Sequence, residues 1–308
     1  MRIVALAGGT GAAKLLRGLD TLVPRGTLTV VGNTGDDALI GGLYISPDLD
    51  TVCYTLGGWI DESRGWGVRD ESFRTLDEMA RFGEPTWFNL GDRDLATHLH
   101  RTRLLREGRS LTEVTAKIAR DLGVRHTILP MSDQRVRTRV RGPDGWLSFQ
   151  EYFVREKTQV DVAEVAYGGA PAAMPAPGVV EAIAAADAII VCPSNPVTSI
   201  GPILAVPGIT DALEATGATV LAISPIVGGE AVSGPAGRLM AACGLEVSAV
   251  GVACAYAPWL DVLLADRRDA ALVPRLEAAG VRAIVAETVM LGREGEMALA
   301  RRALEALE

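Results

Sequence analysis

Short apolar runs that end in glycines or polar residues constrain the fold of this chain more than any other feature. Residues 2–7 (RIVALA) predict a buried strand, GGTG a turn, and AAKLLRGLD at 12–20 an amphipathic helix. A second β-branched run at 27–33 follows closely, so we expect two parallel strands joined by that helix. Strand-like runs return after residue 178: ADAIIVCPSN, ATVLAISPIVGG, VSAVGVAC, DVLLAD and VRAIVAET. The predicted fold is α/β, a Rossmann-like, doubly wound and mainly parallel sheet.

The middle of the chain has a different pattern. Helical segments at 71–83, 92–108 and 110–123 end at glycines placed as C-caps, and the last begins with a capping box, Ser110 to Glu113. VRTRV and WLSFQEYFV, joined by GPDG, predict a β-hairpin or ribbon. We therefore expect a Rossmann-like nucleotide-binding core of residues 1–54 and 166–308, interrupted by a helical and β-hairpin insertion of residues 55–165.

Charge and composition exclude several classes of function. The 308 residues include 30 basic and 38 acidic side chains, a net charge of −8, and no basic block, which argues against nucleic-acid binding. No apolar window approaches the ~20 residues that span a bilayer, and no signal-peptide core is present, so we expect a soluble cytoplasmic protein without membrane contacts. Four widely spaced cysteines without a CxxC pair indicate neither a disulfide framework nor a zinc site.

The first predicted strand ends in GGTGAAK, a candidate anion site. Gly8, Gly9 and Gly11 let backbone amides approach an anion at the start of a helix, and Thr10 and Lys14 are further donors. The segment lacks the GK[ST] of a P-loop and the last glycine of G-x-G-x-x-G. A turn with a purely structural role is the alternative interpretation.

The stretch NTGDDALIGGLYISPDLDT, residues 33–51, holds four aspartates and no lysine or arginine. Enclosed carboxylates repel one another unless a hard cation joins them, whereas solvated ones can simply cap helices. Because the stretch follows the second strand, on the same rim as the glycine turn, we predict a Mg²⁺ site with Asp36 and Asp50 as ligands. Asp37 and Asp48 are then hydrogen-bonding partners of the site or helix caps.

The predicted insertion contributes NLGDRDLATHLHRT. Its spacing places Asp94, His98 and Arg101 on one helix face, with Asp92 near the N-terminus. One interpretation is an exposed helix in which Asp94 pairs with Arg101. In the other, Arg93 faces the cleft as an anion clamp and His98 as a proton donor or acceptor.

A later strand ends in CPSNPVTSIGPIL. Ser194 and Asn195 are placed to hydrogen-bond a nucleotide, and Ser199 and Gly201 offer a second amide-lined turn, although a proline-ordered turn with an N-cap would look the same. SPIVGG and SGPAGRLM add two more glycine turns on the same side. Together these turns predict a rim of nucleotide size.

Taken together, GGTGAAKLL, VGNTGDD, SPDLDT, LGDRDLATH, ILPMSD, PSNPVTSIGPIL, SPIVGG and SGPAGRLM, in this order, resemble the 2-phospho-L-lactate transferase family of coenzyme F-420 biosynthesis. The resemblance covers nearly the whole chain and includes GDRD, which nucleotide binding in general does not require. It implies a homodimer that joins the deazaflavin Fo to a phospho-hydroxyacid activated as a guanosine diphosphate ester, and releases GMP with the help of Mg²⁺.

The resemblance also implies individual site residues. Asp36 and Asp50 match positions associated with the metal and Fo, and Asn89 matches a position near the deazaflavin that is basic in some members. Asn33 and Thr34, within VGNTGDD, are expected to contact substrate. We expect the ribityl hydroxyl of Fo to attack the phosphorus that carries the acid, in line with GMP as leaving group, with Asp50 the first candidate for a general base.

Two other classes of protein share part of this pattern. A non-catalytic, nucleotide-sugar-binding regulator of similar fold would have little use for the aspartates of SPDLDT. An NAD-dependent oxidoreductase conflicts with the imperfect glycine fingerprint and with the late position of Asp50. The sequence leaves the acid open among phospholactate, phosphoenolpyruvate and 3-phosphoglycerate, because a few pocket side chains would select among them.

Overall fold

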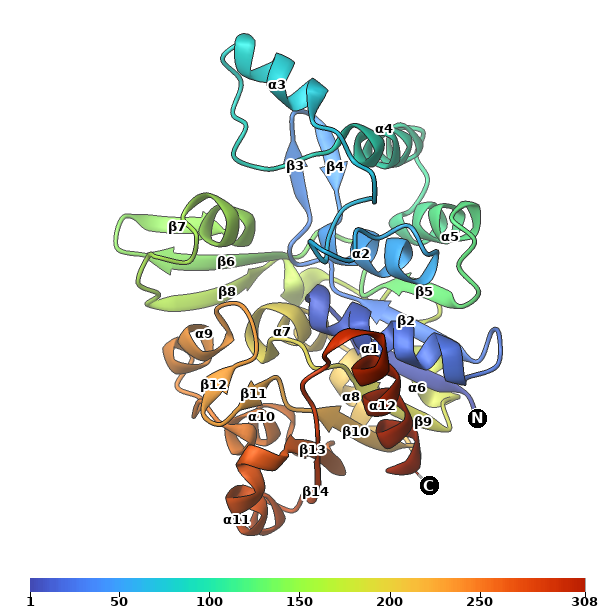
Figure 1. Cartoon of the computed structure of the whole chain (residues 1–308), viewed down its shortest axis with the longest axis vertical. Coiled ribbons are helices and arrows are strands. Elements are labelled where there is room, and N and C mark those ends of the chain that lie inside the picture. The colour runs from blue at the N-terminus through green and yellow to red at the C-terminus, as the bar shows by residue number, and fades with distance from the viewer. Residues whose placement is uncertain (308) are drawn as a thin grey trace.

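Seven parallel strands form the centre of the molecule in the computed structural model, which describes residues 1–307 (Figure 1). Their order is β14-β13-β10-β9-β1-β2-β5, and all neighbouring pairs are parallel. The strands are β1 (Ile3–Ala7), β2 (Leu28–Gly32), β5 (Thr127–Pro130), β9 (Ala188–Val191), β10 (Thr219–Ile223), β13 (Val262–Asp266) and β14 (Arg282–Ala286). The predicted doubly wound α/β fold is confirmed.

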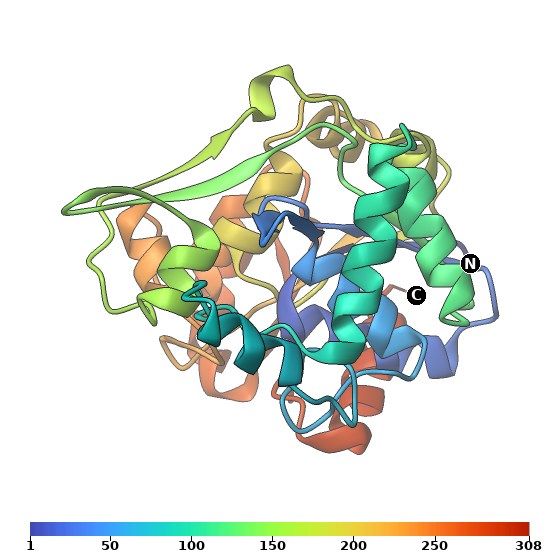
Figure 2. The ribbon, with the colours of Figure 1, turned by 90° about the horizontal axis from the view of Figure 1, so that it is seen from above.

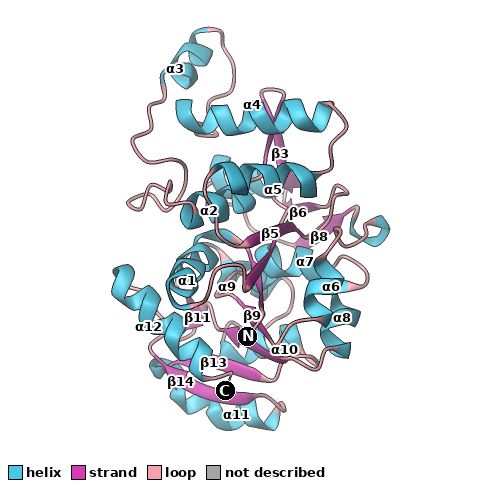
Figure 3. Ribbon diagram, turned by 90° about the vertical axis from the view of Figure 1, so that its right-hand side faces the viewer, coloured by secondary structure: helices cyan, strands magenta, loops and turns pink. Residues whose placement is uncertain are grey.

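Helices cover both faces of the sheet, because its central strands are apolar on both sides; every residue of β1 is buried. One core joins the sheet to α1 (Gly9–Leu22), α2 (Pro47–Leu56), α5 (Leu111–Asp121) and α12 (Gly292–Glu305). The opposite core includes α6 (Val179–Ala184), α7 (Gly201–Leu204), α8 (Ile209–Ala215), α9 (Ala236–Ala242), α10 (Ala249–Tyr256) and α11 (Val273–Ala278). Figures 1 and 3 show α1 and α12 side by side on the first face.

The order of the strands reverses at β1, and this reversal positions the site. From β1 the chain moves to β2 and later β5 on one side, and it then returns to β9 and continues outward to β14 on the other. The carboxyl ends of β1 and β9 therefore diverge into separate loops, which begin at Gly8 and Cys192. Such a switch point is where doubly wound sheets bind their ligands.

The three predicted helices of the insertion are confirmed as α3 (Arg74–Arg81), α4 (Asp92–Arg106) and α5, whose capping box joins Ser110 and Glu113. Within residues 1–307, no single helix is long and apolar enough to cross a membrane. One helical pair, Pro196–Leu204 with Ile209–Ala215, has the length and composition but bends by 84° and contributes to the core.

The boundaries predicted for the insertion do not coincide with structural boundaries. β5, inside residues 55–165, pairs with β2 and forms the edge of the main sheet. The predicted hairpin, β6 (Arg137–Gly142) and β7 (Gly145–Ser148), gains a third strand, β8 (Glu164–Gly168), which crosses the boundary at 165. Figure 2 shows this antiparallel ribbon reaching away from α4 and α5. A four-residue apolar run such as β5 carries too little pattern to reveal which sheet it joins.

Three local predictions were wrong or incomplete. VSAVGVAC does not form a strand: it lies mostly in α10, an apolar helix whose lack of polar periodicity makes it look like a buried strand. The second hairpin strand stops at Ser148, and residues 151–155 form one π-helical turn. The aspartate stretch contains a small hairpin, β3 (Ala38–Ile40) and β4 (Leu43–Ile45), turned by Gly41 and Gly42 with φ of 56° and 77°.

Candidate active site

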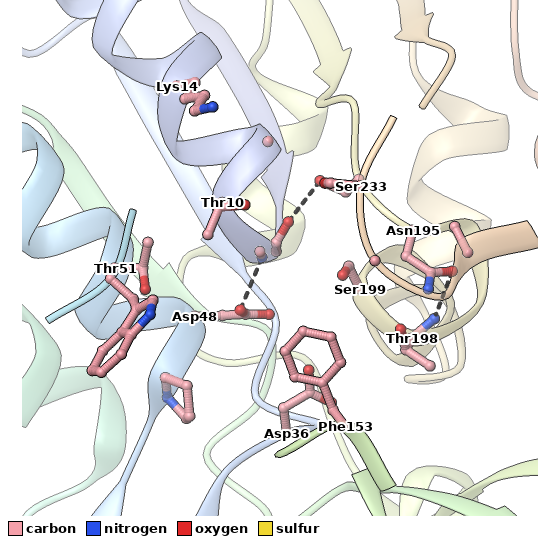
Figure 4. Close-up of a pocket in the computed structure, with 18 of the residues that line it drawn as sticks. Thr10, Lys14, Asp36, Asp48, Thr51, Phe153, Asn195, Thr198, Ser199 and Ser233 are labelled. Atoms are coloured by element: carbon pink, nitrogen blue, oxygen red, sulfur yellow. Dashed lines mark hydrogen bonds between the residues drawn. The ribbon is translucent and has the colours of Figure 1, made fainter. Parts of the chain in front are cut away.

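A cavity of about 750 Å³ lies at the switch point of the sheet. Loops after β1, β9 and β10, the N-terminal turns of α1 and α2, and residues 288–291 line it. Figure 4 shows Asp36 and Asp48 facing this space, with Asn195 and Ser199 across it. The predicted site residues that line it are Gly9, Thr10, Gly11, Lys14, Asp36, Asp48, Asp50, Asn89, His98, Ser194, Asn195 and Ser199.

The glycine turn after β1 brings the loops of β1 and β9 into close contact. Gly9 has φ of 73°, a conformation that favours glycine, and its amide donates to Asp48 Oδ1 at 2.8 Å. Ser194 Oγ donates to the Gly8 carbonyl at 2.8 Å. A Cβ atom at Gly11 would overlap the carbonyl oxygen of Pro193. The Gly9 amide is therefore already used, and the other first-turn amides of α1 remain as candidate anion donors.

Replacing Gly11 with alanine is expected to force the two strand-end loops apart, because the obstructing atom is backbone and cannot rotate away. We expect a loss of about 1–3 kcal/mol of unfolding free energy, typical of overpacking. Urea unfolding measures this effect. Gly217→Ala is the matched control, since a Cβ atom there meets nothing within 4 Å. Equal stability of the two variants would contradict the prediction.

Asp36 and Asp48 form a buried acidic pair in the cavity wall. Asp36 is 6% exposed, and its Oδ1 atom is buried without a hydrogen-bond partner. Burial, and then the nearby charge of Asp48, raise the pKa of Asp36 well above its usual range. Burial also raises the pKa of Asp48, although Asn33 Nδ2 donates to its Oδ2 at 2.9 Å and Gly9 donates to Oδ1. Within residues 1–307 neither carboxylate has a salt-bridge partner.

The raised pKa of Asp36 predicts how the metal-free protein responds to pH. A carboxyl whose folded pKa lies above its unfolded value of about 3.9 stabilises the fold while protonated, and this contribution is lost as pH rises through the folded pKa. We expect the melting temperature in EDTA to fall as pH rises through the raised pKa of Asp36, and to fall less in Asp36→Asn. Scanning calorimetry measures both slopes. Identical slopes in wild type and variant would contradict this origin.

Asp50 differs from its neighbours because it has a basic partner. The Arg101 side chain donates two hydrogen bonds to it, from Nη1 to Oδ2 at 3.0 Å and from Nη2 to Oδ1. Burial lowers the pKa of Arg101, but the charge of Asp50 and these hydrogen bonds raise it by more. The aspartate stretch is thus partly compensated by an arginine 51 residues further along the chain.

The face of α4 that carries Arg101 is buried, although the opposite face of the helix is exposed, and the expected pair of Asp94 with Arg101 does not form. Asp94 accepts a hydrogen bond from the Tyr54 hydroxyl at 2.6 Å and lies 3.2 Å from His98 Nε2. Burial raises the pKa of Asp94, but His98 and Tyr54 outweigh it, so the pKa is lowered. The face of α4 that contains Asp94, His98 and Arg101 therefore packs against α2 beside the cavity.

Three predicted residues of the aspartate stretch lie beside the cavity without lining it. Asn33 is buried and donates to Asp48 and to the Thr198 carbonyl. Thr34 and Asp37 line a separate, smaller cavity of about 300 Å³, and Asp37 accepts a hydrogen bond from Ser46 Oγ. Burial raises the pKa of Asp37 well above its usual range, more than the Ser46 hydrogen bond lowers it.

Three other predicted residues also lie outside the cavity. Asp92 accepts hydrogen bonds from the backbone amides of Arg74 and Thr75 at the start of α3, which is a capping role. Arg93 is exposed and donates to the Arg69 carbonyl, so it is not placed as an anion clamp. Gly201 begins α7, away from the cavity lining.

An aromatic wall of the cavity was not predicted. It consists of side chains from separate segments: Tyr54, Trp66, Phe88, Phe149 and Phe153. The Phe149 and Phe153 rings stack with centroids 5.4 Å apart and planes at 11°. The four-residue spacing of these two phenylalanines is typical of one face of a helix. Residues 146–154 were predicted to form a strand, so this spacing was not interpreted.

The buried acidic pair fits a hard cation such as Mg²⁺ better than it fits a transition metal, which needs a larger cluster of protein ligands. Within residues 1–307, no group of three or more His, Cys, Asp or Glu side chains is arranged to hold a metal ion. Mg²⁺ needs fewer protein ligands, because it takes one or two carboxylates and completes its shell with water and phosphate oxygens. The unpartnered Oδ1 of Asp36 and the adjacent charge of Asp48 fit that requirement.

A doubly wound sheet with glycine-rich and serine-rich loops at its switch point defines an α/β protein with a ligand-sized cavity where such sheets bind their ligands. The comparisons with known proteins narrow this class. The family model described as 2-phospho-L-lactate transferase CofD matches residues 3–298, and the chain belongs to this family of transferases. The family resemblance seen in the sequence is confirmed.

Full-length relatives carry two different names. A protein of Streptomyces griseus subsp. griseus named phosphoenolpyruvate transferase is 49% identical, covering 100% of this chain and 99% of the relative. A 2-phospho-L-lactate transferase of Methanosarcina acetivorans is 45% identical, covering 97% and 96%. A crystal structure of a upf0052 family protein from Bacillus halodurans has a TM-score of 0.66 at 19% identity, covering 99% and 100%, and it shows the same fold.

Proposed function

We propose that this chain transfers a phospho-hydroxyacid group from a guanosine diphosphate ester to the ribityl hydroxyl of the deazaflavin Fo, releasing GMP, in coenzyme F-420 biosynthesis. Family membership and the names of full-length relatives support the reaction class. The single observation that carries the assignment to this cavity is its composition. Its lining combines five aromatic side chains suited to contact a flat ring, loops rich in amides and hydroxyls, and a carboxylate pair without a salt-bridge partner.

Phosphoenolpyruvate is the acid that we propose first. The relatives named phosphoenolpyruvate transferase are 46–49% identical to this chain, and those named 2-phospho-L-lactate transferase are 41–45% identical. Competition between guanosine diphosphate esters of phosphoenolpyruvate, phospholactate and 3-phosphoglycerate, with products separated by mass, tests this choice. A preference for either of the other esters would contradict it.

We propose that Asp36 and Asp48 hold Mg²⁺ in the working enzyme. The sequence alone suggested Asp36 and Asp50, but Arg101 neutralises Asp50, and Asp48 is the other cavity-lining aspartate without a salt-bridge partner. The ion would supply positive charge to offset the diphosphate of the donor. Lys14 on α1 is the one lysine or arginine among the described residues that line the cavity, and it would add a further positive charge.

The residues of the chain position the reactants. We expect first-turn amides of α1, together with Ser199 and Asn195, to bind the phosphates and the nucleoside, and the aromatic wall to orient the acceptor ring. A bond then forms between the ribityl oxygen and the phosphorus that carries the acid. The bond from that phosphorus to the bridging oxygen breaks, GMP leaves with that oxygen, and the hydroxyl proton is released.

Incubating the protein with Fo, the phosphoenolpyruvate ester of guanosine diphosphate and Mg²⁺ tests the proposal directly. We expect Fo to gain the mass of the phospho-acid and GMP to appear in equal amount. Tight guanine nucleotide binding without product would favour a non-catalytic regulator, and reduction of an added nicotinamide cofactor would favour an oxidoreductase. Light scattering of the same sample tests the homodimer, which we propose from the family resemblance.

A further inference from the structure

A buried chain of polar side chains joins α2 to α4 beside the cavity. It runs from Tyr54 through Asp94, His98 and Arg101 to Asp50. Asp50 and Tyr54 lie one turn apart on α2, and the other three share one face of α4. All except Arg101 line the cavity. The chain therefore begins and ends at the cavity, while its arginine is enclosed.

The hydrogen-bond directions along this chain follow from the chemistry of arginine. Arg101 has only donors, so His98 Nδ1, 3.3 Å from Arg101 Nη1, must accept. His98 Nε2 lies 3.2 Å from Asp94 Oδ1, within reach for electrostatic attraction but outside hydrogen-bond geometry. The Tyr54 hydroxyl donates to the same Asp94 oxygen. The His98 ring thus contacts the guanidinium through Nδ1 and Asp94 through Nε2.

Stability alone does not account for this arrangement. Arg101 is 1% exposed, and removing a guanidinium and a carboxylate from water costs several kcal/mol that their attraction only partly offsets. Apolar residues of similar size at such a site are often equally or more stable. The arrangement fixes both carboxylate oxygens of Asp50 at the cavity through two hydrogen bonds from the Arg101 guanidinium.

Asp50 is therefore set apart from the acidic pair. Asp36 and Asp48 line the cavity without a salt-bridge partner, whereas the charge of Asp50 is matched by Arg101. A matched carboxylate attracts a cation weakly but still has lone pairs that accept a hydrogen bond from a neutral donor. The neutral donor in a group transfer to an alcohol is the attacking hydroxyl.

We propose that Arg101 is a positioning residue: it holds Asp50 in the orientation in which Asp50 accepts a hydrogen bond from the hydroxyl of the acceptor substrate. This inference rests on the proposed function. Phosphoryl-group transfer depends largely on positioning, and a displacement of about 1 Å can cost about 10²-fold in rate. Loss of Arg101 therefore lowers kcat and weakens acceptor binding, and it leaves the guanine nucleotide contacts on α1 intact.

The test compares Arg101→Met, Arg101→Lys and His98→Gln with wild type. The matched control is Arg103→Met, because Arg103 is exposed on the same helix and pairs only with Glu107. Four quantities are measured: kcat with Fo, KM for Fo, the Kd of GDP by calorimetry, and the melting temperature. Arg101→Met is expected to lower kcat by about 10²-fold with a GDP Kd within about twofold of wild type. Arg101→Lys is expected to have a kcat about tenfold above that of Arg101→Met, because lysine restores the positive charge but not the two parallel hydrogen bonds.

The outcomes separate a positioning role from a structural one. If Arg101→Met loses GDP affinity in parallel with kcat, or keeps kcat within threefold of wild type, the proposal is overturned. If Arg101→Met does not fold, near-normal kcat in both Arg101→Lys and His98→Gln overturns it, and a fall of about tenfold with unchanged GDP affinity supports it. Absence of product from wild type overturns the proposed function itself, whereas product from wild type with normal turnover in the variants overturns only this inference.

Discussion

Replacing Asp36 with asparagine is expected to abolish most turnover while raising the melting temperature of the metal-free protein. Asp36 has a buried oxygen without a partner, and burial and the charge of Asp48 raise its pKa. Asparagine keeps the shape but removes the charge, so the cost of burying it and the repulsion from Asp48 both disappear. Relief of about 1 kcal/mol would raise the melting temperature of a chain of 308 residues by roughly 1–2 °C.

The activity should change in the opposite direction. Without Asp36 the cavity loses one of its two proposed Mg²⁺ ligands, and we expect kcat to fall by about 10³-fold, as when an electrostatic contact to the transition state is removed. Differential scanning fluorimetry in EDTA and steady-state kinetics in saturating Mg²⁺ measure the two effects. Asp144→Asn, in the exposed turn between β6 and β7, should change neither. A destabilised Asp36→Asn variant with normal kcat would refute this role.

The same chemical change at Asp50 is expected to have the opposite effect on stability. Asp50→Asn leaves the Arg101 guanidinium buried without its counter-charge. Breaking a buried ion pair by removing one partner costs about 3–5 kcal/mol. We therefore expect a large loss of unfolding free energy in urea, in addition to a loss of turnover.

A second substitution identifies the cause of that loss. In Asp50→Asn with Arg101→Met the uncompensated charge is gone, and we expect at least half of the lost stability to return. Turnover should not return, because the carboxylate in the cavity is still missing. An Asp50→Asn variant within about 1 kcal/mol of wild type, or a double variant less stable than the single one, would be inconsistent with a buried pair.

The predictable part of the fold was the part whose signals are local. Each of the correctly predicted features is encoded within a short segment of sequence. Examples are β1 with its glycine turn, the capping box of α5, and the turns after β9 and β10. Apolar segments without a periodic alternation of apolar and polar residues were ambiguous. For this reason α10 was predicted to be a strand, and β5 was assigned to the insertion. In those segments, tertiary burial rather than local pattern decides the structure.

The residues of the site were likewise predictable only where their signals are local. The chain of motifs placed Asp36, Asp48 and the glycine turn on one rim, where the structure also places them. The pairing of Asp50 with Arg101 could not be predicted, because it joins helices from distant parts of the chain, and the helical pattern of α4 fits an exposed face equally well. The aromatic wall is assembled from segments separated by up to about 100 residues, so no local spacing reveals it.

The central claim is that Asp36 and Asp48, the two aspartates that line the cavity without a salt-bridge partner, bind the divalent cation, while Asp50 does not. Titration of Mn²⁺ in the presence of GDP, followed by electron paramagnetic resonance, tests it most directly. We predict one tight site per chain in wild type and in Asp50→Asn with Arg101→Met, and at least about tenfold weaker binding in Asp36→Asn and in Asp48→Asn. Undiminished Mn²⁺ binding in the last two variants, or loss of the site only when Asp50 is replaced, would contradict the account.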